Sequence, residues 1–298
     1  MIISNISAGL GNQLFQYAFG CHLAVLNKTE HKVDISGYKE IEPDPIRGVR
    51  VCGLDNFNIT AKQASKEDMV KFNFLLKNKI FRHLIRFYSK PDSYYKRKYI
   101  LEPEKNYFKF DPCILATKQQ NDVYVEGYWQ SEKYFKNIEN IIRKELSFKE
   151  VPDEINSRMI KDIDGSNSVS LHVRHGDNTK MINGVLPLEY YHRAVMEIAL
   201  KIKDPIFYVF SDDPEWARNN LKLKYPTIYV SHNGDKKNHE DMRLMTHCKH
   251  HILGNSTFSW WGAWLGKKEG QIVFSPKSHH SCPNLPSTDY IPANWMFL

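Results

Sequence analysis

The chain has 298 residues, 42% of them hydrophobic, and a formal net charge of +7, which predict a soluble globular protein of one large or two ordinary domains. It contains no run of about eighteen apolar residues, so no membrane-spanning helix is expected. The opening residues do not read as a secretion signal, and the five cysteines stand singly without Cys-x-x-Cys spacing. We therefore expect a cytoplasmic protein with buried, reduced thiols and neither a disulfide scaffold nor a structural zinc site.

The first predicted element is a strand over residues 1–6, which runs through a Gly-x-Gly turn into a helix over residues 14–25. Gly9 and Gly11 permit a tight turn in which backbone N–H groups face an anion. Leu14 occupies the position of the third glycine of the dinucleotide fingerprint, and no Gly-Lys-Ser/Thr follows. The turn is therefore neither a dinucleotide-binding fingerprint nor a Walker loop.

Two amide side chains follow this turn directly. Asn12 and Gln13 have the donors and acceptors needed to orient a polar ligand. An ordinary strand-to-helix turn is the alternative interpretation. We take Gly11, Asn12 and Gln13 as candidate ligand-binding residues.

The positive charge is concentrated in one segment. Residues 66–98 hold ten lysines and arginines and three acidic residues. The difference of seven positive charges equals the formal net charge of the whole chain. Within this segment, an apolar stripe over residues 65–89 predicts a helix, and Ser65 with Asp68 predicts a capping box at its start. A packed helix with a solvated basic face is the favoured interpretation, and peripheral contact with anionic lipid at the inner membrane is the alternative. Nucleic-acid binding is not expected, because no aromatic-basic recognition module accompanies the run.

An aromatic, amide-bearing loop ends the next predicted strand, within residues 122–131. Such a loop suits a sugar, whose apolar face stacks on rings while its hydroxyls form hydrogen bonds, but core aromatics are an equal alternative. A helix over residues 134–146 follows. The turn residues that come after it predict a domain boundary, which we place between residues 1–155 and 156–298.

The second half alternates regularly between strands and helices. Strands are predicted over residues 168–174, 206–210, 227–230, 252–253 and 272–274, and helices over residues 187–202, 214–222 and 241–249, with a further helix beginning within 254–259. This order predicts a parallel, doubly wound sheet.

Polar residues lie at the carboxyl ends of three of these strands. They are His172, Arg174, His175 and Asp177 at the end of the first, Ser211, Asp212 and Asp213 after the second, and Asn255, Ser256 and Thr257 at a helix start. The carboxyl ends of parallel strands lie at one edge of a sheet, where ligands bind, so we expect these polar residues to share that edge. The planar guanidinium of Arg174 suits a diphosphate, and a helix start rich in hydroxyls can hold phosphate. A surface Arg–Asp pair and ordinary helix capping are the alternatives.

Three acidic residues have more than one interpretation. Asp212 and Asp213 could hold a divalent cation, but Pro214 follows them, so helix capping and nucleotide contact are favoured over a metal site. Asp241 opens a predicted helix, where its carboxylate could accept hydrogen bonds from the ring N–H and the exocyclic amine of guanine together. An N-cap is the alternative for Asp241.

Three motifs occur in the order and spacing of the α-1,2-fucosyltransferases of glycosyltransferase family 11. They are Gly9-Leu10-Gly11-Asn12-Gln13-Leu14-Phe15-Gln16-Tyr17, His172-Val173-Arg174-His175-Gly176-Asp177 and Asn255-Ser256-Thr257-Phe258-Ser259-Trp260-Trp261-Gly262. The Ser211-Asp212-Asp213 and Asp241-Met242 elements match too, so the resemblance covers nearly the whole chain. Animal members carry an N-terminal membrane anchor. Because no membrane-spanning helix is expected in this chain, it resembles a bacterial member.

The resemblance implies a GT-B-like α/β fold, in which two Rossmann-like domains with parallel, doubly wound sheets face a central cleft. It implies inverting, metal-independent transfer of L-fucose from GDP-β-L-fucose to the 2-hydroxyl of a galactoside, with no cofactor. The acceptor is a galactose-terminated oligosaccharide or a lipid-linked glycan. The N-terminal domain would hold this acceptor, and the C-terminal domain would hold the donor.

The resemblance also assigns roles by position. Arg174 matches the arginine that grips the diphosphate, His172 and Asp241 match nucleoside contacts, Ser256 and Thr257 match phosphate contacts, and Asn12 and Gln13 match amides that line the cleft. The expected donor-binding set is Gly11, Asn12, Gln13, His172, Arg174, His175, Ser211, Asp212, Asp241, Asn255, Ser256 and Thr257. We take Arg174 and Asp177 as catalytic, with Asp177 as the candidate base.

One position departs from the family pattern, because His175 stands where a second arginine is usual. A histidine is cationic only below its pKa, so we hypothesise that leaving-group stabilisation here weakens as pH rises. Three other functions stay open. They are transfer of fucose to another position, a metal-dependent nucleotide-sugar transferase that uses Asp212 and Asp213, and a non-catalytic glycan- or nucleotide-binding protein.

Overall fold

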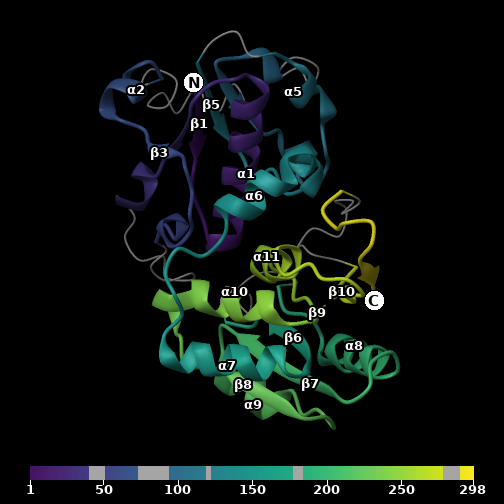
Figure 1. Ribbon diagram of the computed structural model, residues 1–298. Helices are drawn as coiled ribbons and strands as arrows, with labels where there is room; N and C mark the ends of the chain where they lie inside the picture. Colours follow the sequence, from purple (N-terminus) through teal and green to yellow (C-terminus); the bar gives the residue numbers. More distant parts are fainter. Residues whose placement is uncertain (40–50, 73–93, 119–121, 177–183, 278–288) are drawn as a thin grey trace. The chain divides into compact units, whose positions relative to one another are not determined.

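The computed structural model describes residues 1–39, 51–72, 94–118, 122–176, 184–277 and 289–298, and Figure 1 traces the chain. These residues form two compact units. The first contains the described residues up to Ser147 together with Asp289 and Tyr290. The second contains the described residues from Phe148 onward, apart from those two.

The first unit is built on a parallel sheet with strand order β3-β2-β1-β5-β4. Its strands are β1 (Ile2–Asn5), β2 (His31–Asp34), β3 (Lys62–Gln63), β4 (Tyr99–Leu101) and β5 (Val123–Glu126), and its helices are α1 (Leu10–Leu26), α2 (Lys66–Val70), α5 (Pro112–Ala116) and α6 (Glu139–Glu145). Helix α1 packs closely against the sheet. At Gly20 of this helix there is no room for a side chain, since a Cβ there would come 1.9 Å from Ser4 Oγ. The opposite face of β1 packs Ile3 against Tyr99 and Tyr124.

The second unit has a six-stranded parallel sheet with order β11-β10-β9-β6-β7-β8. Its strands are β6 (Asn167–Val173), β7 (Pro205–Ser211), β8 (Thr227–Val230), β9 (His250–Ile252), β10 (Val273–Ser275) and β11 (Met296–Phe297). Its helices are α7 (Glu154–Asp164), α8 (Leu188–Ala199), α9 (Pro214–Asn220), α10 (Asn238–His247) and α11 (Thr257–Leu265). The expected α/β fold with two parallel sheets is confirmed.

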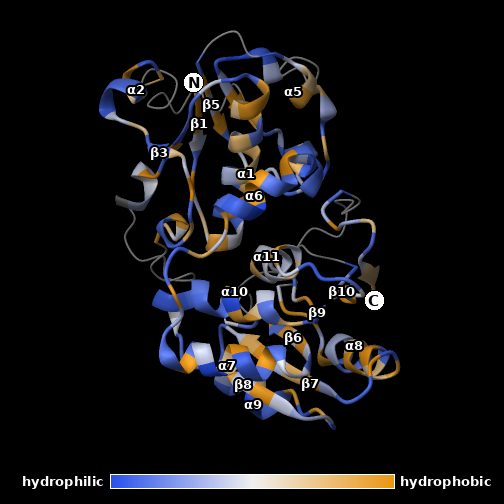
Figure 2. Cartoon of the chain, in the orientation of Figure 1, coloured by the Kyte–Doolittle hydropathy of each residue, from blue (hydrophilic) through white to orange (hydrophobic). Residues whose placement is uncertain are grey.

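Alternating side chains of the central strands reach both faces of this sheet. Val169 and Leu171 of β6 pack with helices α8 and α9, whereas Tyr208 and Phe210 of β7 pack with α7 and α10 on the other face. Figure 2 shows the central strands of this unit mostly in hydrophobic colours, while α10 mixes hydrophilic and hydrophobic residues. The second unit is therefore doubly wound, as the sequence predicts.

Several predicted elements differ from those observed. Helix α6 covers only Glu139–Glu145, because 3₁₀ turns at Glu132–Tyr134 and Lys136–Ile138 take up the start of the predicted 134–146 helix. Helix α10 begins at Asn238, so Asp241 lies within its first turn and neither opens nor caps it. Strand β11 was not expected.

The basic segment is described only at its ends. The predicted capping box is confirmed, since Ser65 accepts from the Asp68 backbone N–H and Asp68 accepts from that of Ser65. The rest of the predicted helix, residues 73–89, lies outside the described residues. None of the described helices is long and apolar enough to cross a membrane.

The cysteines are free where they are described, but their burial varies. Cys21 and Cys248 are buried as expected. Cys52 is partly exposed and Cys113 is exposed, so the prediction of uniformly buried thiols is wrong for these two. Cys113 is the second residue of the short helix α5, a position open to solvent. Cys282 lies outside the described residues.

Candidate functional site

The three polar strand ends of the second unit lie at one edge of its sheet. Strand β6 pairs in parallel with β7 on one side and β9 on the other, so the residues that follow all three strands come out together. Arg174 and His175 follow β6, the Ser211–Asp213 segment ends β7, and Asn255 follows β9. The structure thus assembles the three groups that the sequence analysis placed at a common edge.

Arg174 is held by a carboxylate from the neighbouring strand. Its Nη1 lies 3.2 Å from Asp212 Oδ2, and the guanidinium side chain is 25% exposed. The other oxygen of Asp212 accepts from the backbone N–H of His175 at 2.9 Å. Asp212 therefore fixes both Arg174 and the backbone that follows it. Asp177, the candidate base, lies outside the described residues.

His175 is oriented by two contacts from the start of α9. Its ring stacks on Trp216, with centroids 3.9 Å apart, and its Nδ1 lies 2.9 Å from Asp213 Oδ2. Asp213 also caps α9, because its Oδ1 accepts from the Trp216 N–H, and Ser211 Oγ accepts from the Asp213 N–H. The N-cap predicted from Pro214 is confirmed. Trp216 was not among the predicted site residues, although its position two residues after Pro214 in the first turn of a predicted helix could have indicated it.

Asp212 and Asp213 thus face two cationic or ionisable partners. Asp212 pairs with Arg174, and Asp213 pairs with His175. Across the described part of the chain, no group of three or more histidine, cysteine, aspartate or glutamate side chains is arranged to hold a metal ion. The side chains of Arg174 and His175, held by these two carboxylates, suit the binding of an anion.

His172 lies beneath this edge and is 4% exposed. The pKa of His172 is lowered to about 4, mainly by burial and secondly by the positive charge of Arg174. The ring is therefore neutral at physiological pH. Its Nδ1 is buried with no hydrogen-bond partner among the described residues. The loop after β9 passes so close that a Cβ on Gly254 would come 2.8 Å from the His172 carbonyl oxygen and 3.0 Å from that Nδ1.

Helix α11 begins at the same edge. Ser256 is its N-cap and accepts from the Phe258 N–H, which confirms the capping interpretation for this residue. Thr257 is the first helical residue and is partly exposed. Asn255 donates from its amide to the carbonyl oxygen of Gly184. The N–H groups of the first helical turn have no partner inside a helix, so they and the dipole favour an anion here.

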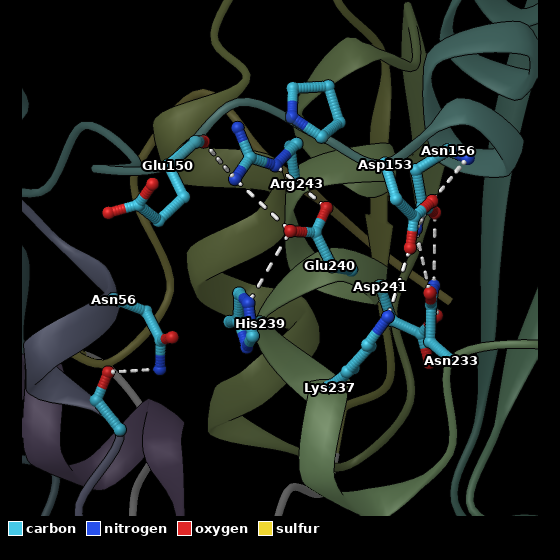
Figure 3. Close-up of polar contacts among 12 residues, drawn as sticks. Asn56, Glu150, Asp153, Asn156, Asn233, Lys237, His239, Glu240, Asp241 and Arg243 are labelled. Carbon is cyan, nitrogen blue, oxygen red and sulfur yellow. Dashed lines mark hydrogen bonds and ion pairs between the residues drawn. The ribbon is translucent and has the colours of Figure 1, made fainter.

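Asp241 lies in the first turn of α10, beside a group of buried amides (Figure 3). Its Oδ1 accepts from Asn233 Nδ2 at 2.7 Å. Burial raises the pKa of Asp241 to about 6, an effect that the bond from Asn233 opposes and the nearby Glu240 reinforces. The carboxylate is thus ionised near neutral pH and protonated in mild acid.

In the first unit, the predicted turn has a different geometry. Helix α1 starts at Leu10, so Gly11 is its second residue, and the positive φ of 64° falls on Ala8 rather than on a glycine. Gln13 is fully buried and donates to the carbonyl oxygens of Ala8 and Val51 while accepting from the Gly53 N–H. The amide of Gln13 therefore holds the protein backbone, which makes it a structural residue in this unit.

Asn12 is partly exposed and connects the same turn to the aromatic loop after β5. Its Oδ1 accepts from Gln130 Nε2 at 2.7 Å. That loop is clamped by Glu102, whose Oε2 accepts from the N–H groups of Tyr128 and Trp129. Glu102 is 2% exposed, and burial raises its pKa to about 7. Nothing in the sequence signalled this role for Glu102.

Comparison with solved structures defines the class of fold. A crystal structure of NodZ α-1,6-fucosyltransferase with GDP aligns with a TM-score of 0.52 at 14% sequence identity, covering 88% of this chain and 90% of that chain. At this identity the likeness shows the fold alone. The fold is the GT-B-like α/β fold of this class of glycosyltransferase, as expected.

Comparison of sequences shows the family. The model of glycosyl transferase family 11 matches residues 1–298, so the chain belongs to this family and is a glycosyltransferase. Two relatives from Escherichia coli are each 31% identical to this chain. They are an α-1,2-colitosyltransferase, with coverage of 99% of this chain and 98% of the relative, and the O-antigen biosynthesis glycosyltransferase WbnK, with 92% and 93%. A galactoside 2-α-L-fucosyltransferase from Caenorhabditis elegans is 23% identical over 59% of this chain and 52% of the relative.

Proposed function

We propose that the protein transfers L-fucose from GDP-β-L-fucose to the 2-hydroxyl of a galactoside and forms an α-1,2 linkage with inversion. Membership of the family supports glycosyl transfer, and the galactoside fucosyltransferase among the relatives supports the sugar and the linkage. GDP in the NodZ structure supports the nucleotide. The observation that carries the proposal is the sheet edge where Arg174, held by Asp212, lies beside the strand that leads into α11.

The chemical step needs stabilisation of the leaving group. As the bond to the sugar breaks, positive charge grows on the sugar ring and negative charge gathers on the departing diphosphate. Arg174 and the first turn of α11 would stabilise that negative charge where it develops. The acceptor hydroxyl would attack from the opposite face of the sugar, which gives inversion. Asp177 remains our candidate base for this hydroxyl.

We also propose that the reaction needs no metal ion or cofactor. Arg174 supplies the positive charge that a divalent cation would provide to a diphosphate. Both carboxylates of the metal-dependent alternative already have partners in Arg174 and His175. These contacts favour the metal-independent reaction over a transferase that uses Asp212 and Asp213.

A second donor has a specific observation in its favour. The α-1,2-colitosyltransferase matches this chain over nearly its full length, whereas the fucosyltransferase relative matches about half of it. Transfer of a colitosyl group with the same linkage is therefore the second candidate. The WbnK relative supports a glycan of O-antigen type as acceptor, either free or lipid-linked. We further propose that the enzyme is cytoplasmic. If its acceptor is lipid-linked, we propose that residues 66–98 contact the membrane surface peripherally.

The test is incubation of the purified protein with GDP-fucose, or with nucleotide-activated colitose, and a panel of galactosides in EDTA. The linkage of the product is read by NMR. We expect an α-1,2-linked sugar on galactose in the presence of EDTA. A product with another linkage, or activity that returns only when a divalent cation is restored, would overturn the proposal.

A further inference from the structure

Two buried asparagines, far apart in the sequence, form a reciprocal pair behind Asp241. Asn156 Nδ2 donates to Asn233 Oδ1 at 2.8 Å, and Asn233 Nδ2 donates back to Asn156 Oδ1 at 3.2 Å. Asn156 is fully buried and Asn233 is 8% exposed. Figure 3 shows this pair beside the start of α10. Because both amides are shielded from water, losing either bond would leave a costly unsatisfied group.

The remaining bonds fix which way each amide points. Asn156 Nδ2 also donates to Asp153 Oδ1 at 3.0 Å, and Asn156 Oδ1 lies 2.9 Å from His232 Nε2. Asp153 accepts only, so the nitrogen of Asn156 must face it. This choice places the oxygen of Asn156 toward Asn233, and therefore the nitrogen of Asn233 toward Asn156 and Asp241. The network has one consistent orientation.

Asp241 lies at the end of this network. Asn233 Nδ2 donates to its Oδ1 at 2.7 Å, the shortest contact that Asn233 makes in the network. A carboxylate accepts about four hydrogen bonds, so Asp241 keeps capacity for further N–H donors. Asp241 is partly exposed as a residue, whereas the asparagines behind it are buried. The carboxylate is thus oriented by Asn233, and Asp241 keeps some exposed surface.

We propose that Asn233, itself held by Asn156, is the positioning residue that orients Asp241 to read the Watson–Crick edge of the donor's nucleobase. This inference rests on the proposed function, because it takes a GDP-sugar as donor. Guanine presents a ring N–H and an exocyclic amine to such a carboxylate, whereas hypoxanthine presents the ring N–H alone. A fixed carboxylate accepts from both donors of guanine, and a carboxylate free to rotate loses the second contact. Asn233 therefore sets the preference for guanine over hypoxanthine.

The experiment measures Kd for GDP and for IDP, whose base is hypoxanthine, by isothermal titration calorimetry. It compares the parent, Asn233→Ala, Asn233→Ser and Lys237→Ala. Asn233→Ser keeps a short donor and serves if the alanine variant does not fold. Lys237→Ala is the matched control, because it removes the exposed ion pair with Asp153 and leaves the bond between Asn233 and Asp241 in place.

We expect the parent and Lys237→Ala to bind GDP roughly tenfold or more tightly than IDP, the value of one hydrogen bond to a charged group. In Asn233→Ala the GDP affinity falls by about that factor while IDP affinity changes by less than about twofold, and Asn233→Ser lies between. An equal loss for both nucleotides, or an unchanged ratio, would overturn the inference and point to a structural role. Failure of the parent to bind GDP would instead overturn the proposed function.

Discussion

The imidazole of His175 stacks on the indole of Trp216, with ring centroids 3.9 Å apart and planes inclined by 11°. The stack, together with the contact to Asp213, fixes the ring beside Arg174 at the sheet edge. A second arginine is usual here in the family pattern given above. These contacts therefore set the orientation of the His175 side chain.

Replacing His175 by arginine tests the hypothesis that leaving-group stabilisation at this position weakens as pH rises. An arginine stays charged at all physiological pH values, whereas the charge of a histidine in general depends on pH. We expect the ratio of the kcat of His175→Arg to that of the parent to increase with pH, by up to about tenfold, the value of one charge-assisted contact. The measurement is a pH profile of kcat for both proteins with saturating donor. Superimposable profiles would show that the histidine charge has no part in the reaction.

Asp241 should make nucleotide affinity pH-dependent on the acid side. Its pKa of about 6 means that it is ionised above that pH and can accept hydrogen bonds from a nucleobase. As pH falls through 6 the carboxylate is protonated, so GDP affinity should fall, by up to about tenfold at one unit lower. Calorimetric titration of GDP at several pH values measures this.

Asn233 and Glu240 act on the same titration in opposite directions. The bond from Asn233 lowers the pKa of Asp241, and the charge of Glu240 raises it. In Asn233→Ala the fall in GDP affinity should therefore begin at a higher pH than in the parent. In Asp241→Asn this acid-side fall should be absent. If the asparagine variant keeps the parental fall, another group is responsible for it.

Glu102 should make stability depend on pH. Its pKa is raised from the usual 4.5 to about 7 by burial, so the folded state favours the protonated form. The stability that this proton contributes is fully present below pH 4.5 and is lost as pH rises to 7. Relative to Glu102→Gln, the parent should lose up to about 3 kcal/mol of unfolding free energy across this range. Urea unfolding of both proteins at a series of pH values checks this, and a constant difference would refute it.

Gly254 should be intolerant of a side chain. In Gly254→Ala the new Cβ would meet the backbone carbonyl of His172 at 2.8 Å, a contact that a rotamer change cannot relieve. We expect a loss of about 1–3 kcal/mol in stability, together with weaker GDP binding because the loop that leads into α11 is displaced. Gly37→Ala is the control, since a Cβ there has no neighbour within 4 Å. Parental melting temperature and GDP affinity for Gly254→Ala would contradict the packing argument.

The alternation of strands and helices allowed much of the second unit to be predicted. Parallel strands bring their carboxyl ends to one edge, so the grouping of Arg174, Asp212 and Asn255 followed from their positions after β6, β7 and β9. The cap at Asp213 followed from Pro214 for a similarly local reason. The start of α10 was misplaced by three residues because Asp241 was read as its first residue.

Long-range pairings were out of reach of the sequence. Asn156 and Asn233 are 77 positions apart, and no local pattern links them. Gln13 was read as a ligand-facing amide, because nothing near it in the sequence shows that the backbone at Val51 and Gly53 uses its donors and acceptor. Glu102 was missed for the same reason, since its partners follow a different strand. Such contacts depend on how the strands assemble and not on local periodicity.

The most direct test of the account is the turnover of Arg174→Ala with GDP-fucose and a galactoside in EDTA. Arg158→Ala, which removes an exposed ion pair on α7, is the matched control. If Arg174 stabilises the departing diphosphate, kcat/KM should fall by about 10²-fold or more in Arg174→Ala, while the melting temperature and the control stay near the parent. A folded Arg174→Ala enzyme with near-parental turnover would show that Arg174 does not stabilise the departing diphosphate.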